Sequence, residues 1–411
     1  MDLRDDAARM QEDLVRLRHA LHREPEIGLD LPRTQEKVLE ALRGLPLEVS
    51  TGTGTTSVTA VLRGSGPGGG GAAPAVLLRG DMDALPVTER VDLPYRSDVE
   101  GAMHACGHDL HTSMLVGAAH LLSAHRDRLD GDVVFMFQPG EEGWDGAGVM
   151  LKEGVLDAAG PRVDAAFGMH VFSASAEQGS YLTRPGTMMS ASDELHVTIH
   201  GAGGHGSMPH RAQDPVPAVA EVVTALQALV TRRFNVFDPV VLTVGQLHAG
   251  TKANVIPDDA HLEATIRTFS TEAQARMAEA APRLVRQVAA AHGLDASVEY
   301  RYQYPVTVND ADETAFAADT ITEVFGPARH VDMAVPLGGS EDFSRVLDEV
   351  PGSFIFLGAT SEGRDPATAP MNHSPLASFD DAVLPDGAAL HAELAVRRLS
   401  ALSAGSPPPT P

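Results

Sequence analysis

The sequence predicts a two-domain α/β protein in which a smaller, ferredoxin-like α+β domain is inserted into the main domain. At 411 residues, the chain is longer than a single hydrophobic core usually grows. Apolar runs alternate with helical segments in the flanking parts, whereas the part between them has the order β-α-β-β-α-β. We therefore expect a discontinuous main domain over 1–189 and 305–402, an inserted domain over 190–304, and a disordered tail over 403–411.

Hydrophobic periodicity supports each element of the main domain. Leucines at helical spacing predict a helix over residues 13–23, which Pro25 ends. The Gly-rich stretch from Gly64 to Pro74 lacks the Lys and Ser or Thr of a phosphate-binding loop, so we interpret it as a hairpin loop between two strands. Polar clusters follow the predicted strands, where open α/β sheets usually place ligands. The other elements are strands over 75–78, 132–137 and 165–171 and a helix over 112–126.

The inserted domain has a different pattern, which begins near Ser190. Alternating Leu195, Val197 and Ile199 predict a strand with one buried face. Roughly a hundred residues in this order are enough for a domain that folds by itself. The other predicted elements are a helix over 216–231, strands over 240–245 and 261–268, a helix over 273–291 and a strand over 297–302.

Composition excludes several classes of protein. Hydrophobic residues make up 43% of the chain and charged residues 21%, which is typical of a globular protein. The formal charge of −25 argues against nucleic acid and anionic membranes as partners. Residues 1–11 lack the apolar core of a signal peptide, and no apolar run reaches the ~18 residues of a membrane span. Cys106 is the only cysteine, so no disulfide can form within the chain and we expect a reducing, cytoplasmic location.

Residues 104–111, with the sequence HACGHDLH, gather three histidines, a cysteine and an aspartate just before a predicted helix. Thiolate and imidazole are ligands that zinc and similar transition metals favour, so this segment predicts a metal site. For any one of these residues taken singly, the alternative is a buried cysteine or a surface histidine without a ligand.

A pair of carboxylates, Glu141 and Glu142, follows an apolar strand in the segment QPGEEG. Two adjacent acids repel each other unless a cation or a shared proton is near, so the pair suits one metal ligand beside one general base. A solvated acidic loop is the alternative. His170 ends the next apolar strand, and in isolation it is better explained as a hydrogen-bonded core histidine.

Other candidate residues lie in and after the inserted domain. His205 lies among glycines that allow the backbone close to a ligand, although a plain glycine-rich hairpin explains the same residues. Asn254 offers an amide, and Arg267 could bind a substrate carboxylate through two parallel hydrogen bonds. A surface salt bridge is the alternative for Arg267. Further on, GGSEDF supplies another acidic turn, and NHSP supplies His373.

Together these segments resemble metallopeptidase family M20, in its amidohydrolase branch of hippurate hydrolases, N-acyl-amino-acid amidohydrolases and indoleacetyl-amino-acid hydrolases. The resemblance extends from the first helix to Pro375. It implies a phosphorylase/hydrolase-like α/β catalytic domain, an inserted lid domain through which two copies dimerise, and two divalent metal ions per subunit, which are Zn, Mn, Co or Ni. The segments that occur in the family's order are RGDMDALPV, HACGHDLHTSMLVGAA, QPGEEG, GMHV, GAGGHGSMPH, ANVIPD, GGSEDF and NHSP.

The resemblance implies a role for each residue of the main domain. Glu141 resembles the catalytic base, which takes a proton from a metal-activated water. Asp83 resembles a carboxylate that orients an active-site group. Cys106 resembles the family residue whose thiolate bridges the two ions. The residues that resemble metal ligands are Cys106, His108, Glu142, His170 and His373.

We therefore expect a metal-dependent amidohydrolase that splits N-acyl amino acids into a carboxylic acid and a free amino acid. In the family, residues that resemble His205, Asn254 and Arg267 contact the substrate, and the histidine often comes from the partner subunit to stabilise the oxyanion. A homodimer with a small-molecule substrate follows. The alternatives are a dipeptidase or carboxypeptidase on the same scaffold and a ligand-binding protein that has lost catalysis. The acyl group, the amino acid, the metal and the roles of His104 and His111 stay open.

Overall fold

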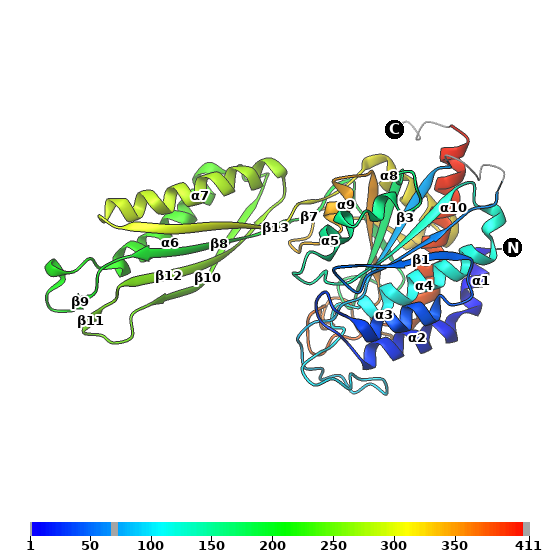
Figure 1. The fold of residues 1–411 in the computed structure, drawn as a ribbon, viewed down its shortest axis with the longest axis horizontal. Coiled ribbons are helices and arrows are strands. Elements are labelled where there is room, and N and C mark those ends of the chain that lie inside the picture. Colours follow the sequence, from blue (N-terminus) through cyan, green and yellow to red (C-terminus); the bar gives the residue numbers. More distant parts are fainter. Residues whose placement is uncertain (1, 67–72, 406–411) are drawn as a thin grey trace. The chain divides into compact units, whose positions relative to one another are not determined.

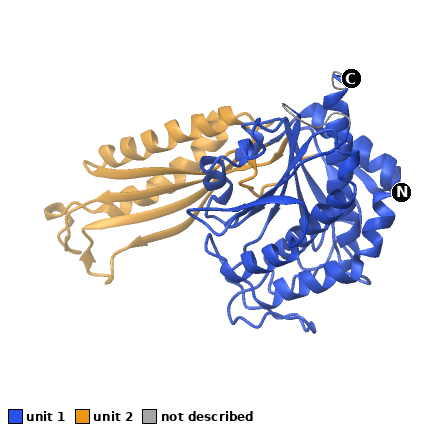
Figure 2. Cartoon of the chain, turned by 45° about the vertical axis from the view of Figure 1, so that its right-hand side comes forward, with its two compact units in different colours: residues 1–186, 308–334, 345–411 blue, residues 187–307, 335–344 orange. Residues whose placement is uncertain are grey.

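The chain, described here from a computed structural model over residues 2–66 and 73–405, divides into two compact units (Figure 2). Unit 1 comprises Met1–Gly186, Val308–Ala334 and Arg345–Pro411, and unit 2 comprises Thr187–Thr307 and Val335–Ser344. Unit 2 is therefore inserted, in sequence, into unit 1. The chain passes between the units at β7 (Gly186–Met189), at β14 (Thr307–Asn309), between Ala334 and Val335, and at the start of α9 (Ser344–Leu347).

Unit 1 is built on an eight-stranded sheet with the order β1-β2-β4-β3-β5-β16-β6-β15 (Figure 1). The strands β4, β3 and β5 are neighbours and run parallel, so their carboxyl ends meet at one edge of the sheet. All residues of β3 and β4 are buried, as expected for parallel strands that are covered on both faces. The strands are β1 (Leu47–Thr51), β2 (Val58–Leu62), β3 (Ala75–Asp81), β4 (Asp132–Gln138), β5 (Ala165–Phe172), β6 (Tyr181–Thr183), β15 (His330–Asp332) and β16 (Gly352–Gly358).

Helices pack on this sheet, and α4 among them carries the candidate metal site at its start. It contacts β3, α2 and α10 and is buried along most of its length, as its apolar residues on all sides require. Gly80 on β3 lets α4 come close, because a Cβ there would lie 2.9 Å from the carbonyl oxygen of His111. The helices of unit 1 are α1 (Leu3–Arg9), α2 (Gln11–Arg23), α3 (Pro32–Ala41), α4 (His108–Ala124), α5 (Gly146–Lys152), α8 (Ala311–Phe325) and α10 (Leu384–Ser403).

Unit 2 is a four-stranded antiparallel sheet with the order β10-β12-β8-β13, and two helices pack against it. Its alternating residues Leu195, Val197 and Ile199 are buried in a separate hydrophobic core. Each helix begins at a side-chain cap, since Asp214 and Ser270 accept hydrogen bonds from the first turns of α6 and α7. The elements are β8 (Ala191–His200), β9 (Gly204–His205), α6 (Pro215–Arg233), β10 (Val240–Ala249), β11 (Val255–Ile256), β12 (Asp259–Thr268), α7 (Thr271–Ala291) and β13 (Asp295–Tyr304).

The hairpin predicted around the Gly-rich stretch is wrong. β4 lies between β2 and β3 in the sheet, so the two strands that flank the stretch do not pair with each other. Strand pairing is decided by partners distant in sequence, which local alternation cannot reveal. Residues 67–72 of this stretch, and residues 406–411 of the predicted tail, lie outside the described residues, and α10 extends to Ser403.

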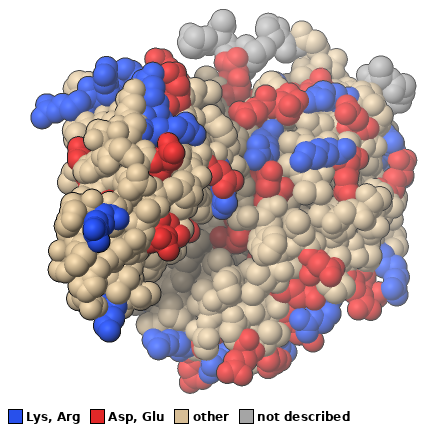
Figure 3. All heavy atoms as spheres, turned by 60° about the vertical axis from the view of Figure 1, so that its left-hand side comes forward, with Lys and Arg blue, Asp and Glu red and all other residues tan. Residues whose placement is uncertain are grey.

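Two features concern possible partners: the distribution of charged side chains on the surface and the apolar character of the helices. A face that binds nucleic acid gathers basic side chains in one patch. On the face in Figure 3, some basic side chains gather at the upper left, and the others are scattered among acidic and uncharged ones. Within the described residues, no helix has the length and apolar character that crossing a membrane requires.

Candidate functional site

The polar segments singled out in the sequence meet at the carboxyl edge of β4, β3 and β5. Asp83 lies two residues beyond β3, the pair Glu141 and Glu142 follows β4, and His170 lies near the end of β5. His108 is the first residue of α4, which starts beside the same edge. Neighbouring parallel strands therefore bring together residues far apart in the sequence, since Asp83 lies 87 positions before His170 and 59 before Glu142.

Gly107 makes the turn between Cys106 and His108 possible. Its φ of 86° lies in the left-handed region that favours glycine. A Cβ at this position would also collide with Val171 and Phe379. The turn can therefore lie directly against β5, which places both neighbours of Gly107 beside His170.

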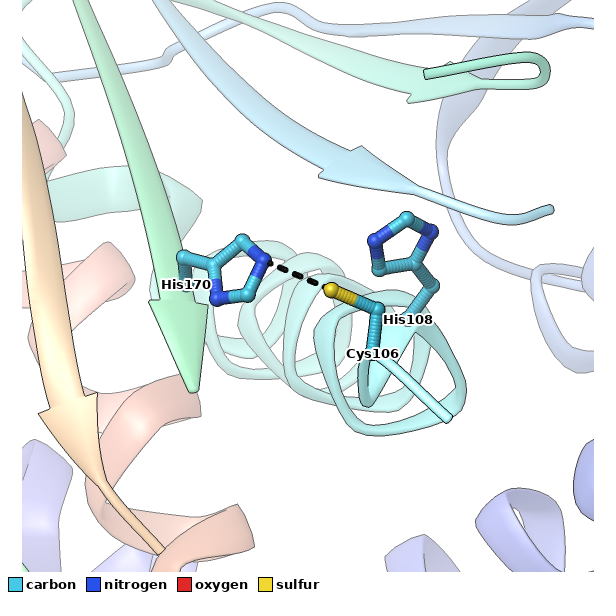
Figure 4. Close-up of side chains that lie close together, drawn as sticks. All are labelled: Cys106, His108 and His170. Atoms are coloured by element: carbon cyan, nitrogen blue, oxygen red, sulfur yellow. Dashed lines mark hydrogen bonds between the residues drawn. The ribbon is translucent and has the colours of Figure 1, made fainter. Parts of the chain in front are cut away.

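Cys106 belongs to two groups of side chains that could each hold a metal ion. In the first group, Cys106 lies with His108 and His170, and its Sγ is 3.3 Å from Nε2 of His170 (Figure 4). In the second, Cys106 lies with Glu142 and His373, and Nε2 of His373 is 3.2 Å from Oε1 of Glu142. All potential ligand atoms within each group lie within 4.8 Å of one another. A thiolate shared by both groups is the arrangement needed to bridge two ions.

The donor atoms of this cluster fit divalent transition metals. Thiolate, imidazole and carboxylate together suit borderline-soft ions such as zinc. His108 gives the most direct indication: both ring nitrogens are buried and neither makes a hydrogen bond among the described residues, while carboxylate oxygens of Asp83 and Asp81 lie 3.5 and 3.6 Å away. A buried polar atom without a partner is costly, and a bound cation would supply one.

The charges around the cluster set its protonation in the metal-free protein. Burial lowers the pKa of His170 well below its usual value, with a further contribution from His111, so His170 offers a neutral imidazole. Hydrogen bonds to Cys106 and Glu142 raise the pKa of His373 to about 10. Burial by itself raises the pKa of Glu142, but His373 and His108 outweigh it and lower that pKa. A metal would therefore displace a proton from His373 on binding.

Asp83 holds the acidic turn in place beside the cluster. Its carboxylate accepts hydrogen bonds from the backbone N–H groups of Glu141, at 2.9 Å, and Glu142, at 3.1 Å. The same carboxylate lies 3.5 Å from Nδ1 of His108. Asp83 and Glu141 are both buried, and Glu141 forms a further group with His108 and Glu142. The solvated acidic loop considered as an alternative is therefore wrong.

The two undecided histidines have different surroundings. His111 binds Asp81 through Nδ1, at 2.5 Å, and accepts a hydrogen bond from the N–H of Val171 through Nε2, at 2.8 Å. His104 is buried near His22, and its ring nitrogens have no hydrogen-bond partner in the described part of the chain. Burial lowers the pKa of His104 to about 3, so its ring is neutral.

Two residues at this edge were missed by the sequence analysis. Asp81 ends β3 and is fully buried beside His111 and His108. Asn372 donates from Nδ2 to the carbonyl oxygens of Val171, at 2.9 Å, and Cys106, at 3.2 Å. The signal available for each was its place within a motif already singled out, since Asp81 lies in RGDMDALPV and Asn372 in NHSP.

The candidates in unit 2 lie at opposite ends of its sheet. His205 pairs with Val255 in the β9–β11 ribbon, and Asn254 accepts a hydrogen bond from Gly206 in the same ribbon (Figure 1). Arg267 lies near the other end of β12, eight residues after Asp259, which is roughly 26 Å along a strand. Its guanidinium donates to the neutral oxygens of Thr265 and Ile266.

The model of peptidase family M20/M25/M40 matches residues 77–397. The chain belongs to this family. Thermostable carboxypeptidase 1 of Saccharolobus solfataricus is 36% identical over 399 residues, which cover 96% of this chain and 98% of the relative. IAA-amino acid hydrolase ILR1-like 4 of Arabidopsis thaliana is 36% identical over 96% of this chain and 87% of its own length. N-acetyl-L-cysteine deacetylase of Bacillus subtilis is 34% identical over 86% and 82%.

A solved structure of the family has a similar fold. The Bacillus subtilis YXEP protein, described as a dinuclear metal binding peptidase from the M20 family, matches with a TM-score of 0.80 and 30% identity, over 96% of this chain and 99% of that one. These relatives confirm the family and the enzyme class expected from the motifs, a metal-dependent hydrolase of amide bonds.

Proposed function

We propose that this M20 enzyme cleaves the amide bond of N-acyl amino acids at a centre of two divalent ions, held by Cys106, His108, Glu142, His170 and His373. The observation that carries the proposal is the membership of Cys106 in two ligand groups, with the buried acid Glu141 directly beside them. Zinc, manganese, cobalt and nickel all suit these donor atoms.

The chain's own residues supply the proton transfers. Bound divalent ions contribute Lewis acidity, which lowers the pKa of a water from ~15.7 to about 7. Glu141 takes the proton of the attacking water and then gives it to the leaving amine. Asp83 fixes the turn that carries Glu141, because its carboxylate accepts a hydrogen bond from the backbone N–H of Glu141.

Arg267 is the group that we propose binds the carboxylate of the amino acid. A guanidinium binds a carboxylate through two parallel charge-assisted hydrogen bonds. In the described structure its guanidinium donates to the neutral oxygens of Thr265 and Ile266. Burial lowers the pKa of Arg267, and the nearby carboxylates of Asp193 and Glu194 oppose this only in part. His205 and Asn254 would contact the acyl side and stabilise the oxyanion.

The distance between these residues supports a homodimer in which unit 2, close to the predicted inserted domain 190–304, acts as the lid. Roughly 26 Å of strand separates the His205 end of the sheet from Arg267. One acylated amino acid is too short to contact both residues of the same chain. We infer that each site combines Arg267 of one subunit with His205 of the partner subunit.

The edge strand β10 is the surface that we propose joins the two lids. It lies at one end of the sheet order and leaves Val241 and Leu247 exposed by 48% and 44%. Val236 and Phe237, just before it, are 80% and 91% exposed. An unpaired strand with apolar neighbours is a template for pairing with a second copy.

The double substitution Val241→Lys and Leu247→Lys should yield monomers, as measured by light scattering. Tyr302→Lys, on the opposite edge strand, is the control and should leave dimers.

A carboxypeptidase activity is the second candidate, because the Saccharolobus relatives carry that name. Both reactions cleave an amide next to an amino acid with a free carboxylate, so the role of Arg267 is the same. They differ only on the acyl side of the bond.

Amine release from N-acetyl, N-benzoyl and indoleacetyl amino acids, N-blocked peptides and free dipeptides tests the proposal. We expect cleavage of one N-acyl class, loss of activity with a chelator, and recovery on adding Zn, Mn, Co or Ni. Cleavage of peptides alone would favour the carboxypeptidase or dipeptidase. Inactivity with every metal would overturn the proposal in favour of a ligand-binding protein.

A further inference from the structure

His111 uses both of its ring nitrogens in hydrogen bonds at the edge of the metal cluster. The N–H of Val171 donates to Nε2, at 2.8 Å, so Nε2 holds the lone pair and the proton lies on Nδ1. Nδ1 then donates to Oδ1 of Asp81, at 2.5 Å. His111 lies close enough to Asp81 and His108 to complete a ligand group, but neither nitrogen is left for a metal. The residue therefore bridges two other groups.

On one side, His111 holds the backbone of Val171, the residue whose carbonyl orients His170. The carbonyl oxygen of Val171 accepts a hydrogen bond from Nδ1–H of His170, at 2.9 Å. That bond leaves Nε2 of His170 as the free lone pair, and Nε2 faces Cys106 at 3.3 Å (Figure 4). The orientation of the His170 ring thus depends on where the backbone of Val171 lies, and His111 holds that backbone through the N–H of the peptide that joins His170 to Val171.

The Val171 N–H needs His111 because the neighbouring strand has ended. The ladder between β3 and β5 stops at the pair Arg79 and Gly168, three residues before Val171. Beyond that point β3 offers no backbone carbonyl to this N–H, and a buried N–H without a partner is costly. His111, from α4, takes the place of the missing strand.

On its other side, His111 is anchored to the core of the sheet. Asp81 accepts a hydrogen bond from Nη1 of Arg79, at 2.5 Å, and Nε of Arg79 donates to Gln138, at 2.9 Å. Thr112, the next residue of α4, donates to the carbonyl oxygen of Asp81 at 2.7 Å. All these side chains are buried. The chain of bonds therefore links the ends of β4 and β3, through α4, to the end of β5.

We propose that His111 is a positioning residue, which holds the backbone of Val171 through its N–H and so fixes the ring of His170 toward the metal site. The inference rests on the proposed function, since His170 is a ligand in that proposal. Two simpler roles compete with it: His111 could merely fill space in the core, or it could serve only to neutralise Asp81. These roles predict different responses to substitution.

Two substitutions separate the hydrogen bonds of His111. The amide of His111→Gln reaches the position of Nε2, where its oxygen can accept the Val171 N–H, whereas the shorter His111→Asn keeps a donor near Nδ1 for Asp81. If His111 acts through Val171, the glutamine variant retains the metal site better than the asparagine variant. A space-filling role predicts equal losses, and a role toward Asp81 alone predicts the reverse order.

Titration of the metal-free proteins with cobalt(II), followed by d–d and thiolate-to-cobalt absorption, measures the effect without activity. We expect His111→Asn to bind one of two ions about 10- to 100-fold more weakly, with altered d–d bands, while His111→Gln stays closer to the wild type. His120→Asn changes a histidine farther along α4 whose Nε2 bonds to the carbonyl of Ala41; this variant is the control and should behave as the wild type. Circular dichroism of the metal-free variants checks that each is folded.

The outcomes also separate this inference from the proposed function. If the wild type fails to bind two cobalt ions, the proposed metal centre is wrong. If the wild type binds two and both His111 variants match it, or if His111→Asn is the better binder, His111 does not position His170. If His111→Gln fails to fold while His111→Asn binds both ions normally, the inference is equally overturned.

Discussion

Individual histidines at this site differ because of their neighbours rather than their burial. His108 and His170 are both buried, yet their pKa values move in opposite directions. Burial lowers both, but Asp81, Asp83 and Cys106 outweigh it at His108 and raise its pKa well above the usual value. His170 lies beside His111 instead, which adds to the lowering. The pKa of each histidine therefore depends on which charged side chains lie beside it at the strand ends.

Removing the proposed base should separate catalysis from metal binding. Glu141→Gln keeps the size of the side chain but cannot accept the proton of a water. We expect two metals to remain bound and the rate to fall by at least ~10²-fold. Metal content and turnover of the purified variant check this together. Turnover near that of the wild type, with both metals bound, would remove Glu141 from this role.

A second residue, Glu313, should make stability depend on pH. Burial raises its pKa to about 7 despite the ion pair with Arg398. The folded protein therefore holds a proton that the unfolded chain has released above about pH 4.5, so stability falls as pH rises toward 7. Between pH 5 and 8, the wild type should lose about 2 to 3 kcal/mol more unfolding free energy than Glu313→Gln.

Urea unfolding at pH 5, 6.5 and 8 measures this difference. Glu323→Gln, an exposed acid on the same helix, is the matched control and should follow the wild type. Parallel pH profiles for the wild type and Glu313→Gln would show that Glu313 does not titrate in this range.

At the scale of elements, α2 and α4 are joined by a buried ion pair beside the proposed metal site. Arg18 on α2 donates from Nε to Asp109 on α4, at 2.7 Å, and His22 binds the same oxygen at 2.8 Å. Both Arg18 and Asp109 have no exposed surface. Asp109 follows His108 directly, so α2 holds the turn that carries His108, a proposed metal ligand.

Breaking this pair should cost much more than breaking a surface pair on the same helix. Arg18→Leu leaves Asp109 charged and buried, which we expect to lower the free energy of unfolding by about 3 to 5 kcal/mol. Arg16→Leu removes an exposed partner of Asp13 and should cost less than about 1 kcal/mol. Chemical denaturation compares the two. Similar losses would mean that α2 is not anchored through Asp109.

At the scale of the whole molecule, the proposed dimer predicts that two variants, each inactive alone, restore activity when they form mixed dimers. A chain with Glu141→Gln still supplies His205, and a chain with His205→Ala still supplies Glu141. In a mixed dimer one of the two sites is then intact. Coexpression should give about a quarter of wild-type activity, because about half of the dimers are mixed.

Each variant purified alone is the control and should be nearly inactive. Adding Val241→Lys and Leu247→Lys to both chains should abolish the recovery, because it removes the proposed interface. No recovery in confirmed mixed dimers would show that one chain supplies both residues.

The sequence by itself determined the types of element, the family and the residues with suitable chemistry. Period and turn residues fix helices and strands locally, so the predicted helix over 273–291 differs from α7 by only two residues at its start. The segments HACGHDLH and QPGEEG likewise name Cys106 and Glu141 because their residue types are informative wherever they lie.

Only the tertiary structure decided which of these residues meet. Insertion of β4 between β2 and β3 overturned the predicted hairpin, and the shared position of Cys106 in two groups depends on strands far apart in sequence. Local pattern left His111 undecided, because its role depends on Asp81 and on Val171, 60 residues away. Most of the length of β12 separates His205 from Arg267. Long-range pairing sets these distances, and a local sequence pattern carries no record of it.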